Sequence, residues 1–219
     1  LIDVNVASRK NMGTSKGIDL SLKFHKKCKI KYDHYYILKC DISKFFYSIN
    51  HDNLKQKLTT RIKDADALKI VFDIIDSNSN GLFIGSMTSQ ILAIFYLNDL
   101  DHFIKEELKI KYYVRYQDDF LLFHPSKKYL QFCLKQIQIF LRKEGLSLNN
   151  KTRIYKNTNN FIFLGRDKIG NYSHYRNVKR KLKSKIYLYL NNKVSLQSLS
   201  SSFICYKGLC NKNFSTFLN

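Results

Sequence analysis

Apolar residues recur at helical spacing along much of the chain and gather into short continuous runs elsewhere. The helical spacing predicts helices over residues 18–29, 51–63, 66–76, 86–109 and 126–143. Asn50 is expected to cap the second of these helices, and Gly145 to end the last. Short runs rich in Tyr, Ile, Val, Phe and Leu predict strands at 35–41, 146–148, 152–155 and 160–165, and a hairpin within 112–123. The mixture predicts an α+β fold.

The predicted hairpin carries two adjacent carboxylates, Asp118 and Asp119, in its turn. Aspartate is common in turns for conformational reasons alone, which is the simplest explanation of the pair. A third carboxylate, Asp41, ends the apolar strand predicted at 35–41. Carboxylates at the ends of neighbouring strands repel one another unless cations bind between them, and Mg²⁺ prefers such oxygen ligands. The pattern therefore favours a two-metal centre for phosphoryl transfer, with Lys39 and Arg115 supporting the carboxylates or contacting backbone.

Composition indicates a folded chain with a polyanionic partner. At 219 residues, with 44% hydrophobic and 14% aromatic content, the chain is long and apolar enough for one sizeable core. Its 38 Lys and Arg exceed its 17 Asp and Glu by 21, which implies nucleic acid or an acidic membrane surface as partner. The five scattered cysteines form no CxxC pair and suit a reducing cytosol. No apolar run reaches the length of a membrane span.

The composition changes near residue 170. Residues 168–219 contain no Asp or Glu, and their apolar spacing predicts a basic amphipathic helix from Arg176. A second, serine-rich helix is predicted over about 196–209. The basic helix is suited to gripping the phosphates of a nucleic acid, largely without reading its sequence.

Two further segments are candidates for phosphate binding. Gly85 lies in the loop before the helix at 86–109, where a missing side chain lets the backbone approach a nucleotide closely. Amides at the start of that helix also suit phosphate. Near the beginning of the chain, Arg9 and Lys10 lie in a basic, glycine-containing segment over 9–17. This segment is either a solvated loop or a basic finger that pairs with the oxygens of a triphosphate.

Taken in order, these segments resemble the sequence motifs of a reverse transcriptase. Asp41 with Phe45 and Phe46 resembles polymerase motif A, and residues 84–90 lie where motif B is expected. The Tyr-Gln-Asp-Asp of 116–119 resembles motif C, 145–152 resembles motif D, and 161–165 resembles the primer-grip motif E. Residues 84–90 read Ile-Gly-x-x-x-Ser-Gln, whereas most members have Pro-Gln-Gly. That form is similar to the reverse transcriptases of diversity-generating retroelements.

The resemblance implies the palm of a right-hand polymerase, an antiparallel sheet with packed helices. Residues 1–34 would be partial fingers, 35–170 the catalytic palm and fingers, and 171–219 a helical basic thumb. The implied activity is RNA-directed DNA synthesis, in which deoxynucleotides are added to the 3′-hydroxyl of a DNA or RNA primer on an RNA template.

The implied cofactor is a pair of Mg²⁺ ions, for which Mn²⁺ can substitute. Asp41, Asp118 and Asp119 would bind them together with the backbone carbonyl of Ile42. Lys151 resembles the motif D lysine that protonates the leaving pyrophosphate, although a surface lysine in a turn is the plainer alternative.

The resemblance also implies contacts with the incoming nucleotide. Phe46 would be the sugar gate that excludes a 2′-hydroxyl, or else a core phenylalanine. Ile84 replaces a polar glutamine beside the nascent base pair, which implies an error-prone enzyme. The other implied nucleotide contacts are Arg9, Lys10, Phe45, Gly85 and Gln90. The implied contacts with primer and template are Phe163, Leu164, Gly165, Arg176, Lys179, Arg180 and Lys183.

Other functions are compatible with the sequence. A phage-defence polymerase of the abortive-infection type resembles reverse transcriptases and can act without a template. A non-enzymatic RNA-binding module would leave the three carboxylates unexplained. The retroelement resemblance further implies a cytoplasmic, bacterial or phage-encoded protein with no membrane association. Its expected partner is a small accessory variability protein, itself an oligomer.

Overall fold

The structure, a computed structural model, describes residues 2–170 and 175–210. It divides into two compact units, residues 1–160 and 161–219. This division falls ten residues before the boundary that the change in composition suggested, because residues 161–167 form a small sheet of their own. The functional division of the chain into fingers, palm and thumb stays a prediction. Among the described helices, none is long and apolar enough to cross a membrane.

The first unit is built on a four-stranded antiparallel sheet. Its order is β2-β3-β1-β4, with β1 at Tyr36–Asp41, β2 at Tyr112–Tyr116, β3 at Asp119–His124 and β4 at Arg153–Lys156. The residues of β1 and β3 pair from Tyr36 with His124 to Asp41 with Asp119. Because side chains alternate between the two faces of a strand, β1 directs Leu38 and Cys40 to one face and Lys39 and Asp41 to the other.

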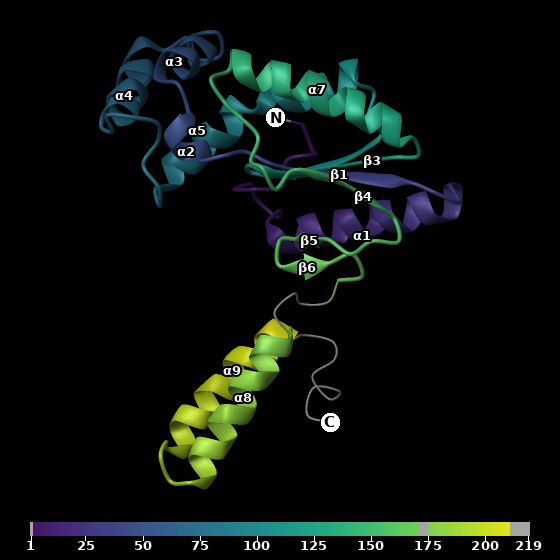
Figure 1. Cartoon of the computed structure of the whole chain (residues 1–219). Helices are drawn as coiled ribbons and strands as arrows, with labels where there is room; N and C mark the ends of the chain where they lie inside the picture. Colours follow the sequence, from purple (N-terminus) through teal and green to yellow (C-terminus); the bar gives the residue numbers. More distant parts are fainter. Residues whose placement is uncertain (1, 171–174, 211–219) are drawn as a thin grey trace. The chain divides into compact units, whose positions relative to one another are not determined.

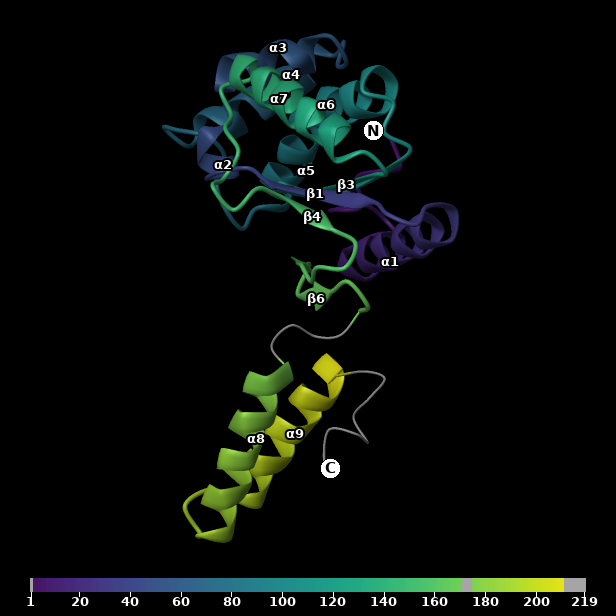
Figure 2. The ribbon, with the colours of Figure 1, turned by 45° about the vertical axis from the view of Figure 1, so that its right-hand side comes forward.

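Helices cover both faces of this sheet (Figure 1). Helix α7, Lys127–Lys143, packs on the face that carries Leu38 and Cys40, and buries Leu130, Cys133, Ile137 and Leu141 there. Helix α1, Thr14–Lys31, packs on the opposite face, where the ring of Phe24 lies against Tyr112 and Phe123. Figure 2, a turned view, shows the same two layers with the sheet between them.

The remaining helices of the first unit join the same core around one end of the sheet (Figure 1). Two of them begin at polar caps. Asn50 accepts a hydrogen bond from the backbone of Asn53, as predicted, and Asp64 accepts one from the backbone of Ala67. Ser126 caps α7 in the same way through Tyr129. The helices are α2 at Phe45–Ser48, α3 at His51–Thr59, α4 at Ala65–Asp76 and α5 at Met87–Tyr96.

The prediction of one long helix over 86–109 is wrong. The chain breaks after α5, forms α6 at Asn98–His102, and then forms a π-helical segment, η1, at Phe103–Glu107. In η1 the backbone of Leu108 donates to Phe103, five residues earlier. The apolar spacing runs through these breaks, so hydrophobic pattern alone does not show them. The break turns Asp101 inward, where it is fully buried.

The second unit contains a β-hairpin and a pair of helices. The hairpin joins β5, Ile162–Phe163, to β6, Arg166–Asp167, so the strand predicted over 160–165 is shorter than expected. Leu164 and Gly165 form its turn, with φ of +49° and +76°, the left-handed conformation that a two-residue hairpin loop requires. The predicted strand at 146–148 is reduced to one isolated bridge, in which Leu148 pairs with Ile42, the residue after β1.

The two helices of the second unit match the prediction closely. They are α8 at Tyr175–Leu190 and α9 at Leu196–Cys210. Val178 and Leu182 form the buried seam of α8, and Leu199 and Phe203 of α9 pack against it. The Lys185 ammonium donates to the hydroxyl of Ser202 at 2.7 Å, which links the two helices across this seam.

Candidate active site

The end of β1 and the turn between β2 and β3 lie side by side. Asp41, the last residue of β1, is directly opposite Asp119, the first residue of β3. The next backbone amide, that of Ile42, donates to the carbonyl of Asp118 at 3.2 Å. The turn consists of Gln117 and Asp118, one residue earlier than predicted, and Gln117 has a φ of +53°. The sheet register thus brings all three predicted carboxylates to the same end of the two central strands, β1 and β3.

The carboxylates are partly buried and close enough to influence one another. Burial, reinforced by the negative charge of Asp41, raises the pKa of Asp118 above its ordinary value. Burial also raises the pKa of Asp119 to about 6, with Asp41 and Asp118 adding to the shift. Lys39 opposes this shift, since its ammonium lies 2.8 Å from both oxygens of Asp119. Lys39 therefore supports a site carboxylate, as the sequence suggested.

The arrangement of the carboxylates bears on the predicted metal centre. Within residues 2–170 and 175–210, no three His, Cys, Asp or Glu side chains are grouped so that they could hold one together. Both oxygens of Asp119 accept hydrogen bonds from Lys39. Asp41 and Asp118 still offer the hard oxygen donors that Mg²⁺ prefers, and the Ile42 backbone lies between their segments. The donor chemistry of these carboxylates fits a divalent cation, and the three-carboxylate ligand set stays a prediction.

The raised pKa of Asp119 makes stability depend on pH. The folded chain holds the Asp119 proton more tightly than the unfolded chain, whose carboxyl titrates near 3.8, so stability falls as pH rises towards 6. In EDTA, the wild-type chain should lose thermal stability relative to Asp119→Asn between about pH 4.5 and pH 7. Thermal melts at a series of pH values measure this difference. When Lys39→Met is added to both proteins, this difference in stability should grow, because Lys39 favours the charged Asp119 carboxylate. A difference that does not depend on pH would contradict the assignment.

A buried ion pair supports the carboxylate turn from behind. The guanidinium of Arg115, on β2, donates to Asp101 through Nε at 2.7 Å and Nη2 at 2.5 Å, and both side chains are fully buried. Tyr113 donates to the same carboxylate at 2.7 Å. Burial alone would lower the pKa of Arg115, but the Asp101 charge outweighs it and raises that pKa. Nη1 of Arg115 donates to the Gln117 carbonyl at 3.0 Å, which ties the turn to this cluster.

Asp101 is a residue that sequence reasoning missed. Its position in an apparently continuous amphipathic helix gave no sign that it would be buried. Arg115 was expected to support the carboxylates or contact backbone. It donates to the backbone of the turn, and its positive charge favours the ionised form of Asp118.

The segment that resembles motif D runs beside the end of β1. The backbone of Asn149 donates to the Asp41 carbonyl at 2.7 Å, and Ser43 donates to Ser147 at 2.9 Å. Asn149 also accepts, through its side chain, a hydrogen bond from the backbone of Lys151. Lys151 is exposed and follows Asn149 by two residues. Its predicted position near the Asp41 segment therefore agrees with the backbone path, while its role stays a prediction.

The two phenylalanines after Asp41 have different environments. Phe45 is 2% exposed and belongs to the main core, and its contact with a nucleotide stays a prediction. Phe46 is half-buried and meets Phe45 edge to face, with ring centroids 5.6 Å apart. The Phe46 carbonyl accepts from Leu82 at 2.7 Å. A Cβ on Gly81 would lie 2.1 Å from that same carbonyl, so only glycine fits this approach.

The loop before α5 presents Phe83 and Ile84 to solvent, while Leu82 is buried. Ile84 is 54% exposed, and Gly85 has a φ of +101° with open space where a Cβ would lie. Gln90, on the first turn of α5, accepts a hydrogen bond from the hydroxyl of Ser8 at 2.8 Å. This contact joins the beginning of the chain to the motif B segment, and the sequence did not predict it.

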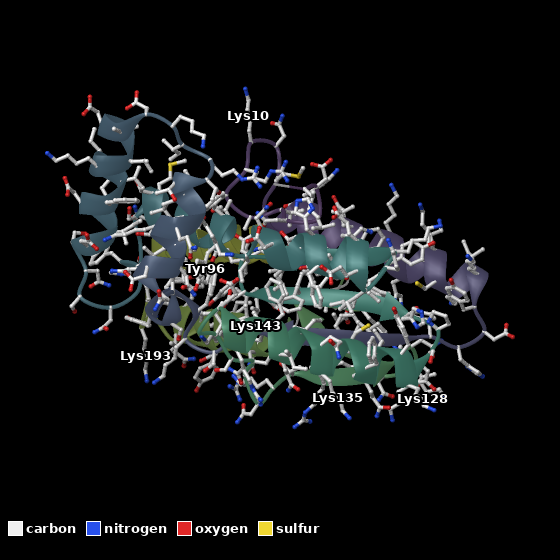
Figure 3. The ribbon with its side chains drawn as sticks, turned by 90° about the horizontal axis from the view of Figure 1, so that it is seen from above. Lys10, Tyr96, Lys128, Lys135, Lys143 and Lys193 are labelled. Carbon is white, nitrogen blue, oxygen red and sulfur yellow. The ribbon has the colours of Figure 1, made fainter. Side chains whose placement is uncertain are left out.

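In the basic segment near the beginning of the chain, Arg9 is hydrogen-bonded within the fold and Lys10 is exposed to solvent. Arg9 donates to the carbonyls of Ile2 and Asn5 and to the carboxylate of Asp3, so its guanidinium holds the local loop together. Lys10 is exposed and extends away from the fold (Figure 3). Of the two predicted phosphate contacts, Lys10 is therefore the one that points into solvent.

The predicted primer and template contacts lie in the second unit. Phe163 is buried, while Leu164 and Gly165 form the turn of the hairpin. On α8, Arg180 and Lys183 are exposed and Lys179 is half-buried. The backbone of Arg176 belongs to α8, and its side chain lies outside the described part of the structure.

Solved structures share this fold. A telomerase from Candida tropicalis, truncated from its C-terminal domain, matches with a TM-score of 0.60 and 20% identity over 75% of this chain and 39% of that chain. The C. tropicalis telomerase in complex with the TWJ fragment of telomeric RNA matches with a TM-score of 0.60 and 16% identity over 97% and 43%. The corresponding Candida albicans structure gives 0.59 and 15% over 74% and 33%. The chain thus spans less than half the length of each telomerase.

The fold shared with these structures is a palm-like antiparallel sheet between helical layers. Residues 2–167 match the family model described as reverse transcriptase (RNA-dependent DNA polymerase). The chain therefore belongs to the reverse transcriptase family. No curated protein matches it significantly.

Proposed function

We propose that this protein is an RNA-directed DNA polymerase that adds deoxynucleotides to a primer 3′-hydroxyl. The observation that supports it best is the register pairing of Asp41 with Asp119, together with the Ile42 hydrogen bond that brings Asp118 beside them. Membership of the reverse transcriptase family supports the reaction. A telomerase of similar fold is in complex with a fragment of telomeric RNA, which supports RNA as the template.

In this proposal Asp41 and Asp118 hold divalent cations, Mg²⁺ or Mn²⁺, with help from the Ile42 carbonyl. Such ions, when bound, lower the pKa of an attacking hydroxyl and stabilise a leaving pyrophosphate. Asp119 contributes negative charge and is kept in place by Lys39. Lys151 supplies a proton to the leaving group, and Lys10 attracts the triphosphate.

Primer extension on defined templates tests the proposal. Extension with deoxynucleotides and Mg²⁺ is expected on an RNA template and should stop when the template is withdrawn. Extension that continues without any template would instead favour the abortive-infection type of polymerase. No incorporation under any of these conditions, by a chain shown to be folded, would refute the polymerase assignment.

Two residues are proposed to set nucleotide selection. Phe46, half-buried and held by the close approach of Gly81, would exclude a 2′-hydroxyl from the sugar site. Ile84, exposed beside the glycine loop, cannot donate or accept hydrogen bonds at the nascent base pair. Missing polar contacts weaken discrimination between correct and incorrect pairs, so the enzyme would be error-prone.

The fidelity proposal predicts the effect of Ile84→Gln. A glutamine at this position restores a hydrogen-bonding group, and the error frequency should fall by roughly 10-fold, with adenine in the template showing the largest change. Sequencing of extension products from both proteins measures the errors. Ile91→Gln on the exposed side of α5 is a matched control and should leave the error spectrum unchanged. Equal spectra for wild type and Ile84→Gln would remove the basis of the proposal.

The proposed biological setting is a diversity-generating retroelement of a bacterium or phage. The Ile-Gly-x-x-x-Ser-Gln form of 84–90 supports this. In that setting a small accessory protein would bind the basic surface. In the same proposal α8 and α9 form a thumb, and Lys179, Arg180 and Lys183 grip the phosphates of the primer–template. The hairpin turn at Leu164 and Gly165 would lie against the primer.

A further inference from the structure

Helix α7 carries a row of cations along its outer face. Lys128, Lys135 and Arg142 follow one another at seven-residue intervals, two helical turns apart, so they lie on one line. Neighbours in this row are separated by about 10.5 Å along the helix axis. Lys127 and Lys143 lie at the two ends of the helix, and α7 contains no Asp or Glu. All five cations are exposed, and Figure 3 shows Lys128 and Lys135 at the outer margin of the molecule.

This row lies on the far side of the sheet from the carboxylates. The inner face of α7 packs against Leu38, Cys40 and Leu122, whereas Asp41 and Asp119 belong to the other face by strand alternation. The sheet and α7 itself therefore separate the α7 row from any primer–template held at the carboxylates. Concentrated positive charge on this face needs a different polyanion to account for it.

Two large apolar side chains lie beside the row. Phe132 and Ile139 are 49% and 48% exposed, and they too are separated by seven residues, so they flank the cations along the same face. Cations that pair with phosphates, alternating with an exposed aromatic ring, suit a single strand whose bases are free to stack. A duplex keeps its base faces inside its own stack, so it would leave Phe132 unused.

We propose that the outer face of α7 binds a single-stranded segment of RNA, at a site separate from the primer–template. The choice of RNA over DNA rests on the proposed function, since an RNA-directed polymerase works on an RNA that extends beyond the copied segment. Phosphates pair with Lys128, Lys135 and Arg142, and an unpaired base stacks on Phe132. Such a contact would hold the template RNA on the protein while its copied segment moves through the active site.

The test is binding of the full chain to fluorescein-labelled oligouridine RNA, followed by anisotropy at a series of salt concentrations. Excess unlabelled primer–template duplex occupies the carboxylate side. The test variant combines Lys128→Gln, Lys135→Gln and Arg142→Gln. Its control combines Lys29→Gln, Lys63→Gln and Lys69→Gln, which remove the same charge from exposed positions elsewhere.

The row variant should bind oligouridine roughly 10-fold more weakly, and its slope of log affinity against log salt should be smaller by about 2, at about 0.7 per phosphate contact. The control should change much less. Phe132→Ser should weaken binding without altering the slope, because it removes stacking and no charge. Primer extension on a short primer–template should be unchanged in the row variant, so failure here is distinct from failure of the polymerase assignment.

Several results would overturn the proposal. Equal binding by the row variant and its control would show that only the overall charge matters. Unchanged affinity after Phe132→Ser, or equal affinity for duplex RNA, would exclude a single-strand site. Loss of extension in the row variant would assign these cations to the primer–template instead. Binding of phosphatidylserine vesicles that depends on the row, with RNA binding retained, would make it a membrane-facing surface.

Discussion

Asp118→Asn should slow nucleotide addition by at least roughly 10³-fold, which corresponds to ~4 kcal/mol of lost transition-state stabilisation. Asp118 and Asp41 are the carboxylates that we propose as the principal metal ligands, whereas both oxygens of Asp119 are engaged by Lys39. A neutral amide oxygen is a much weaker ligand for Mg²⁺ than a carboxylate. Single-turnover primer extension at saturating Mg²⁺ measures the rate.

The same substitution should not weaken the fold. Burial and the charge of Asp41 both disfavour ionised Asp118, as its raised pKa shows, so an uncharged side chain relieves this repulsion. The thermal unfolding midpoint of Asp118→Asn should equal or exceed that of the wild-type chain at neutral pH. Loss of activity together with retained stability would separate a chemical role from a structural one.

Asp119→Asn is the matched comparison. Its two oxygens are held by Lys39, so its loss should reduce the rate about 10-fold less than the loss of Asp118. If both variants lose activity equally, the Lys39 contact does not describe the working state of the site. If Asp118→Asn retains the wild-type rate, the assignment of this carboxylate as a metal ligand fails.

The local elements of this fold follow from the sequence because their causes are local. Asn50 precedes an apolar periodic segment and caps its helix as expected, and Ser126 caps α7 in the same way. Asp41 ends an apolar run, and it ends β1. The apolar period of residues 86–109, in contrast, continues through the break at Leu97, so the pattern predicted one helix where the chain forms three segments.

The contacts that organise the candidate site are non-local, and the pattern of the sequence does not contain them. The pairing of Lys39 with Asp119 joins residues eighty apart, and it depends on the register of β1 with β3. Burial of Asp101 with Arg115 contradicts the expectation that charged residues lie at the surface. Phe45 and Phe46 are adjacent and chemically identical, and only the packing decides that the first is core.

Arg115→Met should lower the free energy of unfolding by about 3–5 kcal/mol, because it leaves the Asp101 carboxylate buried without its cation. A domain of this size has a total stability of about 5–15 kcal/mol, so the loss is a large fraction of the whole. Urea denaturation at neutral pH measures it. Glu106→Gln, which removes the exposed ion pair with His102, is the control and should cost about 1 kcal/mol or less.

A second substitution separates the contribution of Arg115 to stability from its contribution to the position of the carboxylate turn. Asp101→Asn with Arg115→Met removes both charges, while the asparagine oxygen still accepts from Tyr113, so most of the lost stability should return. The Gln117 carbonyl still lacks the donor that Arg115 supplied, and Gln117 is held in a left-handed conformation that is unfavourable for a residue with a side chain. The double variant should therefore fold stably and yet extend primers roughly 10-fold more slowly, because the turn that carries Asp118 is less well fixed.

The outcome of the double variant decides what the buried pair does. Recovery of stability without recovery of rate makes Arg115 a positioning residue for the carboxylate turn, and the reduced rate should appear in the chemical step rather than in the KM for the nucleotide. Recovery of both would make the pair purely structural. If Arg115→Met alone is as stable as the wild-type chain, then the buried charge of Asp101 is relieved by other means, and the pair does not support the site.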